Sequence, residues 1–149
     1  MMKEVNIFDK KNIFLLEPYD GIEFIYSVLQ NIGHYSDFTT LKARRDGLKV
    51  INQLFVLDLI EIFHWGKYQR ELNDKKLSIF EIMMYIQELW FIGANFENFH
   101  NMPMFKYKNW YISELEKLGM THTTDWEEFV KNKIGDLEKW IKENKPKDV

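Results

Sequence analysis

The 149-residue sequence contains no cysteine. A chain without cysteine has no disulfide bond, no thiolate metal site and no cysteine nucleophile, and this composition fits a reducing compartment. The sequence also has no segment close to the roughly 20 apolar residues that a membrane-spanning helix requires. Its first residues, MMKEVNIFDKK, carry charges where a secretory signal has an apolar stretch. We therefore expect a soluble, cytoplasmic protein that does not enter a membrane.

The signatures of common catalytic sites are missing as well. The sequence has no HExxH pair, no glycine-rich phosphate loop and no nucleophile elbow. Two of its four serines, Ser36 and Ser78, stand where helix caps are expected, so a serine-based catalytic triad is unsupported. We expect a protein that is not an enzyme and that uses no cofactor.

Neither sign of charge dominates the chain. It carries 20 basic and 23 acidic residues, and the net charge of −3 argues against a generic binder of nucleic-acid backbones. The imbalance lies in the middle, where residues 51–100 hold four bases and seven acids. If several of these acids share a face, they attract a basic partner; the alternative is an ordinary solvated surface. The seven acids are Asp58, Glu61, Glu71, Asp74, Glu81, Glu88 and Glu97.

The length suits a single domain, and 46% hydrophobic residues with 16% aromatics are enough to fill one core. We expect one helical domain over residues 1–149, frayed at 1–10 and 144–149. Apolar residues recur at helical spacing in five segments, which predicts a mainly α bundle of about five helices. The segments are residues 21–32, 36–57, 78–92, 110–118 and 124–142.

Capping residues precede the first three of these helices. The segments Asp20–Glu23 and Ser78–Glu81 have the spacing of capping boxes. Ser36 or Asp37 can cap the second helix. The third helix is apolar over more than half of its circumference, so we expect it to be central in the fold.

The character of the sequence changes at residues 59–65, LIEIFHW. Such a short run of β-branched and aromatic residues predicts a strand, with a buried helical turn as the alternative. Residues 67–76 are polar and predict a loop, so we expect one short strand or hairpin around residues 59–69. Residues 95–108 contain three asparagines and a proline, which predicts an irregular connection.

Two copies of Glu-x-x-His, at residues 61–64 and 97–100, raise the question of a di-metal site. On a helix this spacing places a carboxylate and an imidazole on one face. Gly66 follows the first copy, and asparagines surround the second, so neither stands in good helical sequence. We expect no metal site. His34 and His122 fall in predicted loops beside helix ends, where we expect surface or capping roles.

Residues 105–111, FKYKNWY, interleave aromatic rings with two lysines. This composition is used to stack unpaired bases against a charged backbone. The alternative is that Phe105, Trp110 and Tyr111 anchor a loop to the core while the lysines stay in solvent. The acidic balance of the whole chain favours the second interpretation.

Most of residues 41–92 consists of a helix ending in LFVLDLIEIFHW, then a polar loop, and then the segment LSIFEIMMYIQELW. This arrangement resembles small bacterial immunity proteins, the cytoplasmic partners of contact-dependent and other polymorphic toxins. The resemblance implies a non-enzymatic inhibitor that binds a basic cognate toxin domain and blocks its active site. With the local charge deficit, it indicates Glu61, Glu71, Asp74 and Glu97 as partner-binding residues, because carboxylates can occupy a basic substrate-binding cleft.

The alternative function is a winged-helix-like nucleic-acid-binding or regulatory domain. In that interpretation the helix over residues 36–57 presents Arg44 and Arg45, and the following strand and loop form the wing. Salt-dependent binding to DNA or RNA distinguishes the two functions, because an acidic inhibitor shows none.

Overall fold

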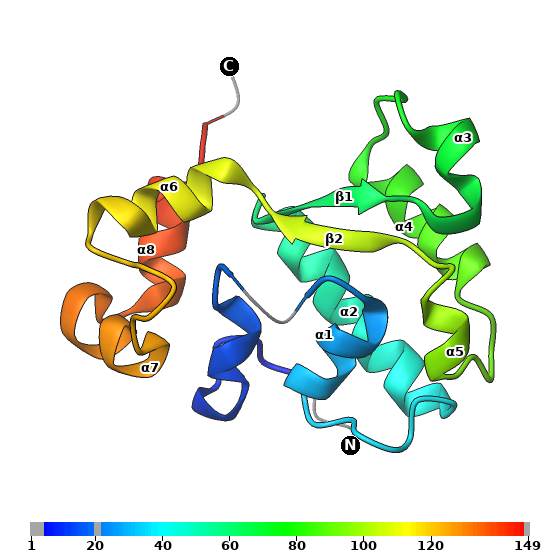
Figure 1. Cartoon of the computed structure of the whole chain (residues 1–149), viewed down its shortest axis with the longest axis horizontal. Helices are drawn as coiled ribbons and strands as arrows, with labels where there is room; N and C mark the ends of the chain where they lie inside the picture. Colours follow the sequence, from blue (N-terminus) through cyan, green and yellow to red (C-terminus); the bar gives the residue numbers. More distant parts are fainter. Residues whose placement is uncertain (1–4, 20–21, 148–149) are drawn as a thin grey trace.

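The computed structural model describes residues 5–19 and 22–147. Within these residues the chain is mainly helical, and its only sheet is a two-stranded antiparallel pair (Figure 1). This confirms the predicted mainly α fold with a short strand near residues 59–69.

The elements follow one another in a helix-rich order with the two strands far apart in the chain. The α-helices are α1 (Ile25–Asn31), α2 (Leu41–Val56), α3 (Gln69–Leu72), α4 (Ile79–Leu89), α5 (Phe96–Phe99), α6 (Asn109–Lys117), α7 (Trp126–Phe129) and α8 (Leu137–Asn144). The 3-10 helices are η1 (Lys10–Leu16) and η2 (Gly66–Tyr68), and η3 (Val130–Ile134) is a π-helix. The strands are β1 (Ile60–His64) and β2 (Met104–Tyr107).

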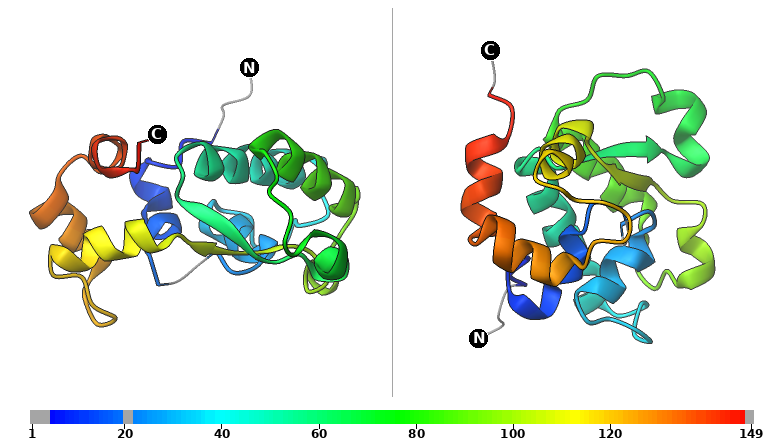
Figure 2. Two further views of the ribbon diagram at one scale, coloured as in Figure 1. Left: turned by 90° about the horizontal axis from the view of Figure 1, so that it is seen from above. Right: turned by 60° about the vertical axis from the view of Figure 1, so that its left-hand side comes forward.

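The longest helices lie behind the strands. Seen from above, α2 and α4 run side by side at the back of β1 and β2 (Figure 2, left). The helices α6, α7 and α8 gather at one end of the molecule, and α3, α4 and α5 at the other, with η1 between them (Figure 1). This layout places the acids of α3, α4 and α5 at one end, whereas Asp58 contacts Lys108 and Trp110 at the start of α6.

The first two predicted helices begin later than expected. The predicted box at Asp20–Glu23 includes two residues outside the described ranges, and α1 begins at Ile25 after Phe24, which gives no side-chain cap. Thr40 caps α2, because its Oγ1 accepts a hydrogen bond from the Ala43 N–H at 3.1 Å. The predicted caps Ser36 and Asp37 are therefore wrong.

The capping box at the start of α4 is confirmed. The Ser78 hydroxyl accepts from the Glu81 N–H at 3.1 Å, and the Glu81 carboxylate accepts from the Ser78 N–H at 3.0 Å. These two bonds satisfy N–H groups that the first turn of a helix leaves without partners.

The last predicted helix is broken in two. After α7 the chain forms the π-helix η3, then turns at Gly135, whose φ of 84° lies in the left-handed region. Asp136 caps the new helix α8 by accepting from the Lys139 N–H at 3.1 Å. A glycine that adopts positive φ, followed at once by a capping acid, ends one helix and starts another.

The predicted strand is present as β1, and its partner comes from a distant segment. Ile60 pairs with Tyr107, Glu61 with Lys106 and Ile62 with Phe105, with an irregularity between Ile62 and His64. The prediction of an irregular connection over residues 95–108 is thus wrong, since it holds both α5 and β2. The predicted loop over residues 67–76 includes α3.

Buried aromatic side chains tie η1 to the rest of the core. The hydroxyl of Tyr107 donates to the Leu15 carbonyl, that of Tyr111 donates to the Leu16 carbonyl at 2.6 Å, and the Trp126 indole donates to the Ile13 carbonyl at 2.8 Å. These bonds satisfy carbonyl groups that a short 3-10 helix leaves open. Ile7, within the segment expected to fray, is also buried.

Candidate functional site

The four predicted partner-binding acids lie on separate parts of the α3–α5 end. Glu61 is on β1, Glu71 on α3, Asp74 in the turn that follows α3, and Glu97 on α5. Figure 1 places α3 above the strand pair and α5 below it. The structure therefore brings Glu71 and Asp74 to one side of the strands and Glu97 to the other.

Glu61 lies on the outer face of the sheet and has a basic neighbour. It stands opposite Lys106 in the strand register, with 3.4 Å between the lysine Nζ and the Glu61 carboxylate. Both side chains are about half exposed, so the pair is screened by solvent. Lys106 offsets the negative charge of Glu61, which weakens its attraction for a basic partner.

Glu71 shares its surroundings with an acid on α4. The hydroxyl of Tyr68 donates to the Glu88 carboxylate at 3.3 Å. The negative charge of Glu88 raises the pKa of Tyr68 above its ordinary value, and partial burial, the hydrogen bond and the charge of Glu71 add to this effect. The acidic surface that begins on α3 thus continues onto α4.

The helix α4 was expected to be central, but the structure places it at the surface. Met83, Ile86 and Leu89 are buried, whereas Phe80 is 74% exposed and Met84 is 55% exposed. The apolar circumference of α4 is wide because one part covers the core and another part faces solvent. An exposed apolar face of this kind marks interaction surfaces in soluble proteins.

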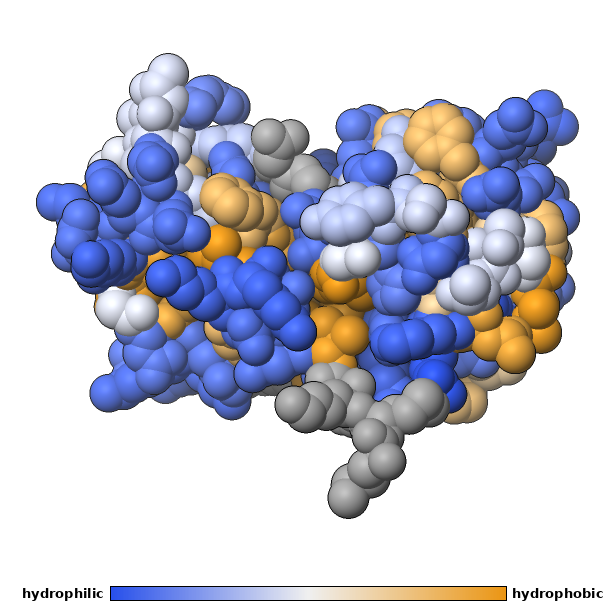
Figure 3. Space-filling view, turned by 90° about the horizontal axis from the view of Figure 1, so that it is seen from below, coloured by the Kyte–Doolittle hydropathy of each residue, from blue (hydrophilic) through white to orange (hydrophobic). Residues whose placement is uncertain are grey.

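More exposed apolar side chains follow directly after α4. Phe91 is 51% exposed and Ile92 is 68% exposed, and Phe96 at the start of α5 is 43% exposed. Phe91 and Ile92 lie beyond the end of the helix, and we call Phe80 and Met84 the α4 apolar face. Hydrophobic residues reach the surface at the right-hand end in Figure 3, while the opposite end is largely hydrophilic.

A groove between α2 and α4 borders the α4 apolar face. It has a volume of about 480 Å³, and its walls include Leu48 and Asn52 from α2 and Ile79, Phe80 and Met83 from α4. Sequence reasoning did not identify this surface, although its signal was present in the wide apolar circumference of α4. Lys49 and Gln87 also line the groove, so it is only partly apolar, and the exposed acids Glu81 and Glu88 lie on α4 outside its wall. A partly apolar groove beside a helix with exposed acids is suited to bind an amphipathic segment of another protein.

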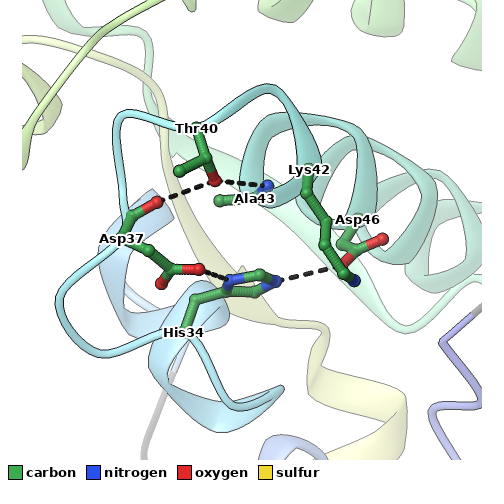
Figure 4. A network of polar contacts seen from close by, with 6 residues as sticks. All are labelled: His34, Asp37, Thr40, Lys42, Ala43 and Asp46. Carbon is green, nitrogen blue, oxygen red and sulfur yellow. Dashed lines mark hydrogen bonds and ion pairs between the residues drawn. The ribbon is translucent and has the colours of Figure 1, made fainter.

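A second cluster of ionisable groups surrounds His34 (Figure 4). His34 was expected at the surface or in a cap, but it is only 7% exposed. Its Nδ1 lies 2.7 Å from Asp37 Oδ2, and its Nε2 lies 3.0 Å from Asp46 Oδ2. Lys42 Nζ donates to the same Asp46 oxygen at 2.8 Å. Both ring nitrogens of His34 face carboxylate oxygens.

The electrostatics of this cluster favour a charged Asp46. Burial raises the pKa of Asp46, but hydrogen bonds from Lys42 and His34, together with their positive charges, outweigh burial and leave the pKa below its ordinary value. The cluster lines a cavity of about 630 Å³. Its acids and bases are bonded to one another, and the nearby Thr40 hydroxyl donates to the Asp37 carbonyl at 2.9 Å. The arrangement joins the end of α1 to the start of α2.

The Glu-x-x-His pairs are not arranged as metal ligands. Glu61 and His64 lie on β1, where the irregularity between Ile62 and His64 interrupts the alternation of faces, and His64 Nδ1 accepts a hydrogen bond from the Gly66 N–H at 2.9 Å. The ring of His100 packs against Phe24 and Phe96. Across residues 5–19 and 22–147, no group of three or more metal-binding side chains is placed to hold an ion.

The aromatic and lysine-rich segment serves the core. Phe105, Tyr107 and Tyr111 are almost fully buried, and Lys108 forms an ion pair with Asp58. This arrangement supports the interpretation of residues 105–111 as a core anchor rather than a base-stacking surface.

Arg44 is engaged by α4 and the residue that follows it. Its Nε donates to the Trp90 carbonyl at 2.7 Å, and one of its terminal nitrogens donates to the Gln87 carbonyl at 2.8 Å. These bonds satisfy carbonyls at the end of α4. The guanidinium is therefore already used within the fold, which weakens the winged-helix alternative.

No protein-family model, no curated protein and no solved structure matches the chain. Among the described helices, none combines the length and the apolar character needed to cross a membrane.

Proposed function

We propose that this protein is a non-enzymatic inhibitor of the immunity type, which binds a cognate bacterial toxin domain in the cytoplasm and blocks its active site. The observation that carries the proposal is the α4 apolar face, which is exposed to solvent on the same helix as the exposed acids Glu81 and Glu88.

The surface has the two properties that a protein-binding site requires. Large apolar side chains such as Phe80 and Met84 supply binding free energy when a partner covers them, because their burial removes apolar area from water. The carboxylates of Glu71 and Glu88 attract a basic partner and raise the association rate. Domains that act on phosphate-bearing substrates have basic clefts, so this surface is suited to occupy such a cleft.

The segment that resembles immunity proteins contributes this surface. Residues 41–92 run from the start of α2 to the exposed turn after α4, and they include the groove between the two helices. The resemblance and the exposed surface thus involve the same part of the chain, although they are independent observations.

Coexpression with a toxin domain tests the proposal. Each candidate toxin domain encoded in a neighbouring reading frame is induced with and without this protein, and growth is measured together with copurification of the two chains. We expect restored growth and a stable complex. Failure to restore growth with any toxin domain encoded beside it contradicts the proposal, and salt-dependent binding to DNA or RNA would favour the winged-helix alternative.

A further inference from the structure

The exposed residues of α4 follow the spacing of a helix-pairing surface. Phe80, Met84 and Gln87 are exposed and are separated by four and then three residues. At about 100° per residue they lie within roughly 60° of one another around the helix. This is the 4–3 spacing by which one helix packs along another. We call these three residues the α4 seam.

The two sides of the α4 seam differ in charge and in cover. On one side lie the exposed acids Glu81 and Glu88, each directly after a seam residue and seven residues apart. On the other side Met83 is buried against the core and borders the groove that α2 closes. A helix seated on the seam therefore has carboxylates along one flank and, along the other, the α2–α4 groove, which combines apolar side chains with Lys49 and Asn52.

We infer that the α4 seam receives an amphipathic helix of the partner, with apolar side chains at 3–4 spacing and lysine or arginine residues facing Glu81 and Glu88. This inference rests on the proposed function and specifies the kind of segment that the inhibitor recognises. Apolar side chains of the partner helix pack on Phe80 and Met84 and enter the groove beside α2.

Charge argues against a second, antiparallel copy of this chain as the occupant. In an antiparallel pair of α4 helices, the acidic flank of one copy lies along the acidic flank of the other, so Glu81 and Glu88 face like charges. A basic helix from another protein avoids this conflict.

A synthetic helical peptide provides the direct test. It carries leucine at the seam-facing positions and lysine at the flanking positions, and a matched peptide carries glutamate in place of lysine. Fluorescence anisotropy is measured at low and high salt against the full chain. We expect the lysine peptide to bind more tightly than the glutamate peptide and to lose affinity as salt increases.

Substitutions on the chain locate the binding. Phe80→Ser combined with Met84→Ser is expected to weaken lysine-peptide binding at least about tenfold, since both side chains lose buried apolar area. Glu81→Gln with Glu88→Gln is expected to weaken it several-fold and to reduce the salt dependence; glutamine retains the capping bond to Ser78. Phe14→Ser is the matched control, because Phe14 is 50% exposed but lies on η1. Thermal unfolding checks that each variant is folded.

Several outcomes would overturn the inference. The inference is wrong if the two peptides bind equally well, or if the seam variant, Phe80→Ser with Met84→Ser, binds the lysine peptide as tightly as the wild type. It is also wrong if the wild-type chain self-associates and the seam variant does not. The growth assay separates this failure from failure of the proposed function. If the wild type and the seam variant protect equally well, the inhibitor function stands and the seam inference is wrong; if the wild type fails to protect against any neighbouring toxin domain, the inhibitor function fails.

Discussion

At the scale of single residues, His34 is the buried polar group with the most demanding surroundings. It bonds two carboxylates, one of which, on Asp46, is itself only 6% exposed. A buried charged network is stable only while each member keeps its partners, because an unpaired buried charge costs several kcal/mol.

We expect His34→Ala to lower the free energy of unfolding by about 3 kcal/mol, since it leaves the buried Asp46 carboxylate with Lys42 as its remaining side-chain partner. Urea denaturation measures the change. His122→Ala is the control, because His122 is exposed and contacts the ring of Tyr19; its cost should stay below about 1 kcal/mol. A similar loss in both variants would contradict a special role for His34.

The pH dependence of stability should report on Asp46. A carboxyl group with a lower pKa in the folded chain stabilises the fold above its unfolded pKa, near the ordinary value of 3.8, and loses that contribution as the pH falls through the folded pKa. The groups that face Asp46 are the His34 imidazole and the Lys42 ammonium group. We therefore expect Asp46→Asn to be less stable than the wild type near neutral pH.

The difference in unfolding free energy between Asp46→Asn and the wild type should shrink as the solution is acidified below pH 3.8. Denaturant unfolding at a series of pH values measures it. A difference between Asp46→Asn and the wild type that stays constant down to strongly acidic pH would show that the Asp46 charge does not contribute.

At the scale of elements, Gly47 shows how helix packing overrides helix propensity. The sequence alone indicates a cost of about 1 kcal/mol for glycine inside a helix, relative to alanine. In the structure, a Cβ at position 47 would lie 2.5 Å from the Trp90 ring and 3.0 Å from Leu29. Glycine therefore permits the close approach of α1, α2 and the end of α4.

We expect Gly47→Ala to destabilise the protein by about 1 kcal/mol or more, because the steric overlap with the Trp90 ring exceeds the gain in helix propensity. Thermal or urea unfolding gives the change. In a Trp90→Phe background the ring is smaller, so the same substitution should cost less, and a double-mutant cycle measures this coupling. A stabilising effect of Gly47→Ala would contradict the packing argument.

Prediction of the elements succeeded where the signal was local. The capping box at Ser78 and Glu81 links neighbouring backbone groups, and the strand at 60–64 follows from its own residue types. The break at Gly135 and Asp136 also has a local signal, which the apolar periodicity over residues 124–142 concealed.

At the scale of the whole molecule, the acids differ in their ability to attract a partner. Glu61 is offset by Lys106, whereas Glu71 and Glu88 lie near each other around Tyr68. Long-range attraction depends on such local imbalances of charge, and salt screens it.

We expect Glu71→Gln and Glu88→Gln together to slow association with the toxin domain several-fold at low ionic strength, and Glu61→Gln to slow it less. Stopped-flow or surface-based kinetics measure the association rates. The rates of the wild type, the double variant and Glu61→Gln should converge at high salt. A larger effect of Glu61→Gln than of the pair would show that the partner approaches over the sheet instead.

The sequence by itself determined the mainly α class, the cap of α4 and the position of β1, because these depend on hydrogen bonds and side-chain patterns within a few residues. Tertiary structure alone decided that β1 pairs with β2, that His34 is buried, and that one face of α4 stays open to solvent. Each of these features depends on which distant segments pack together, and a pattern of apolar residues shows that a face can be buried without showing what buries it.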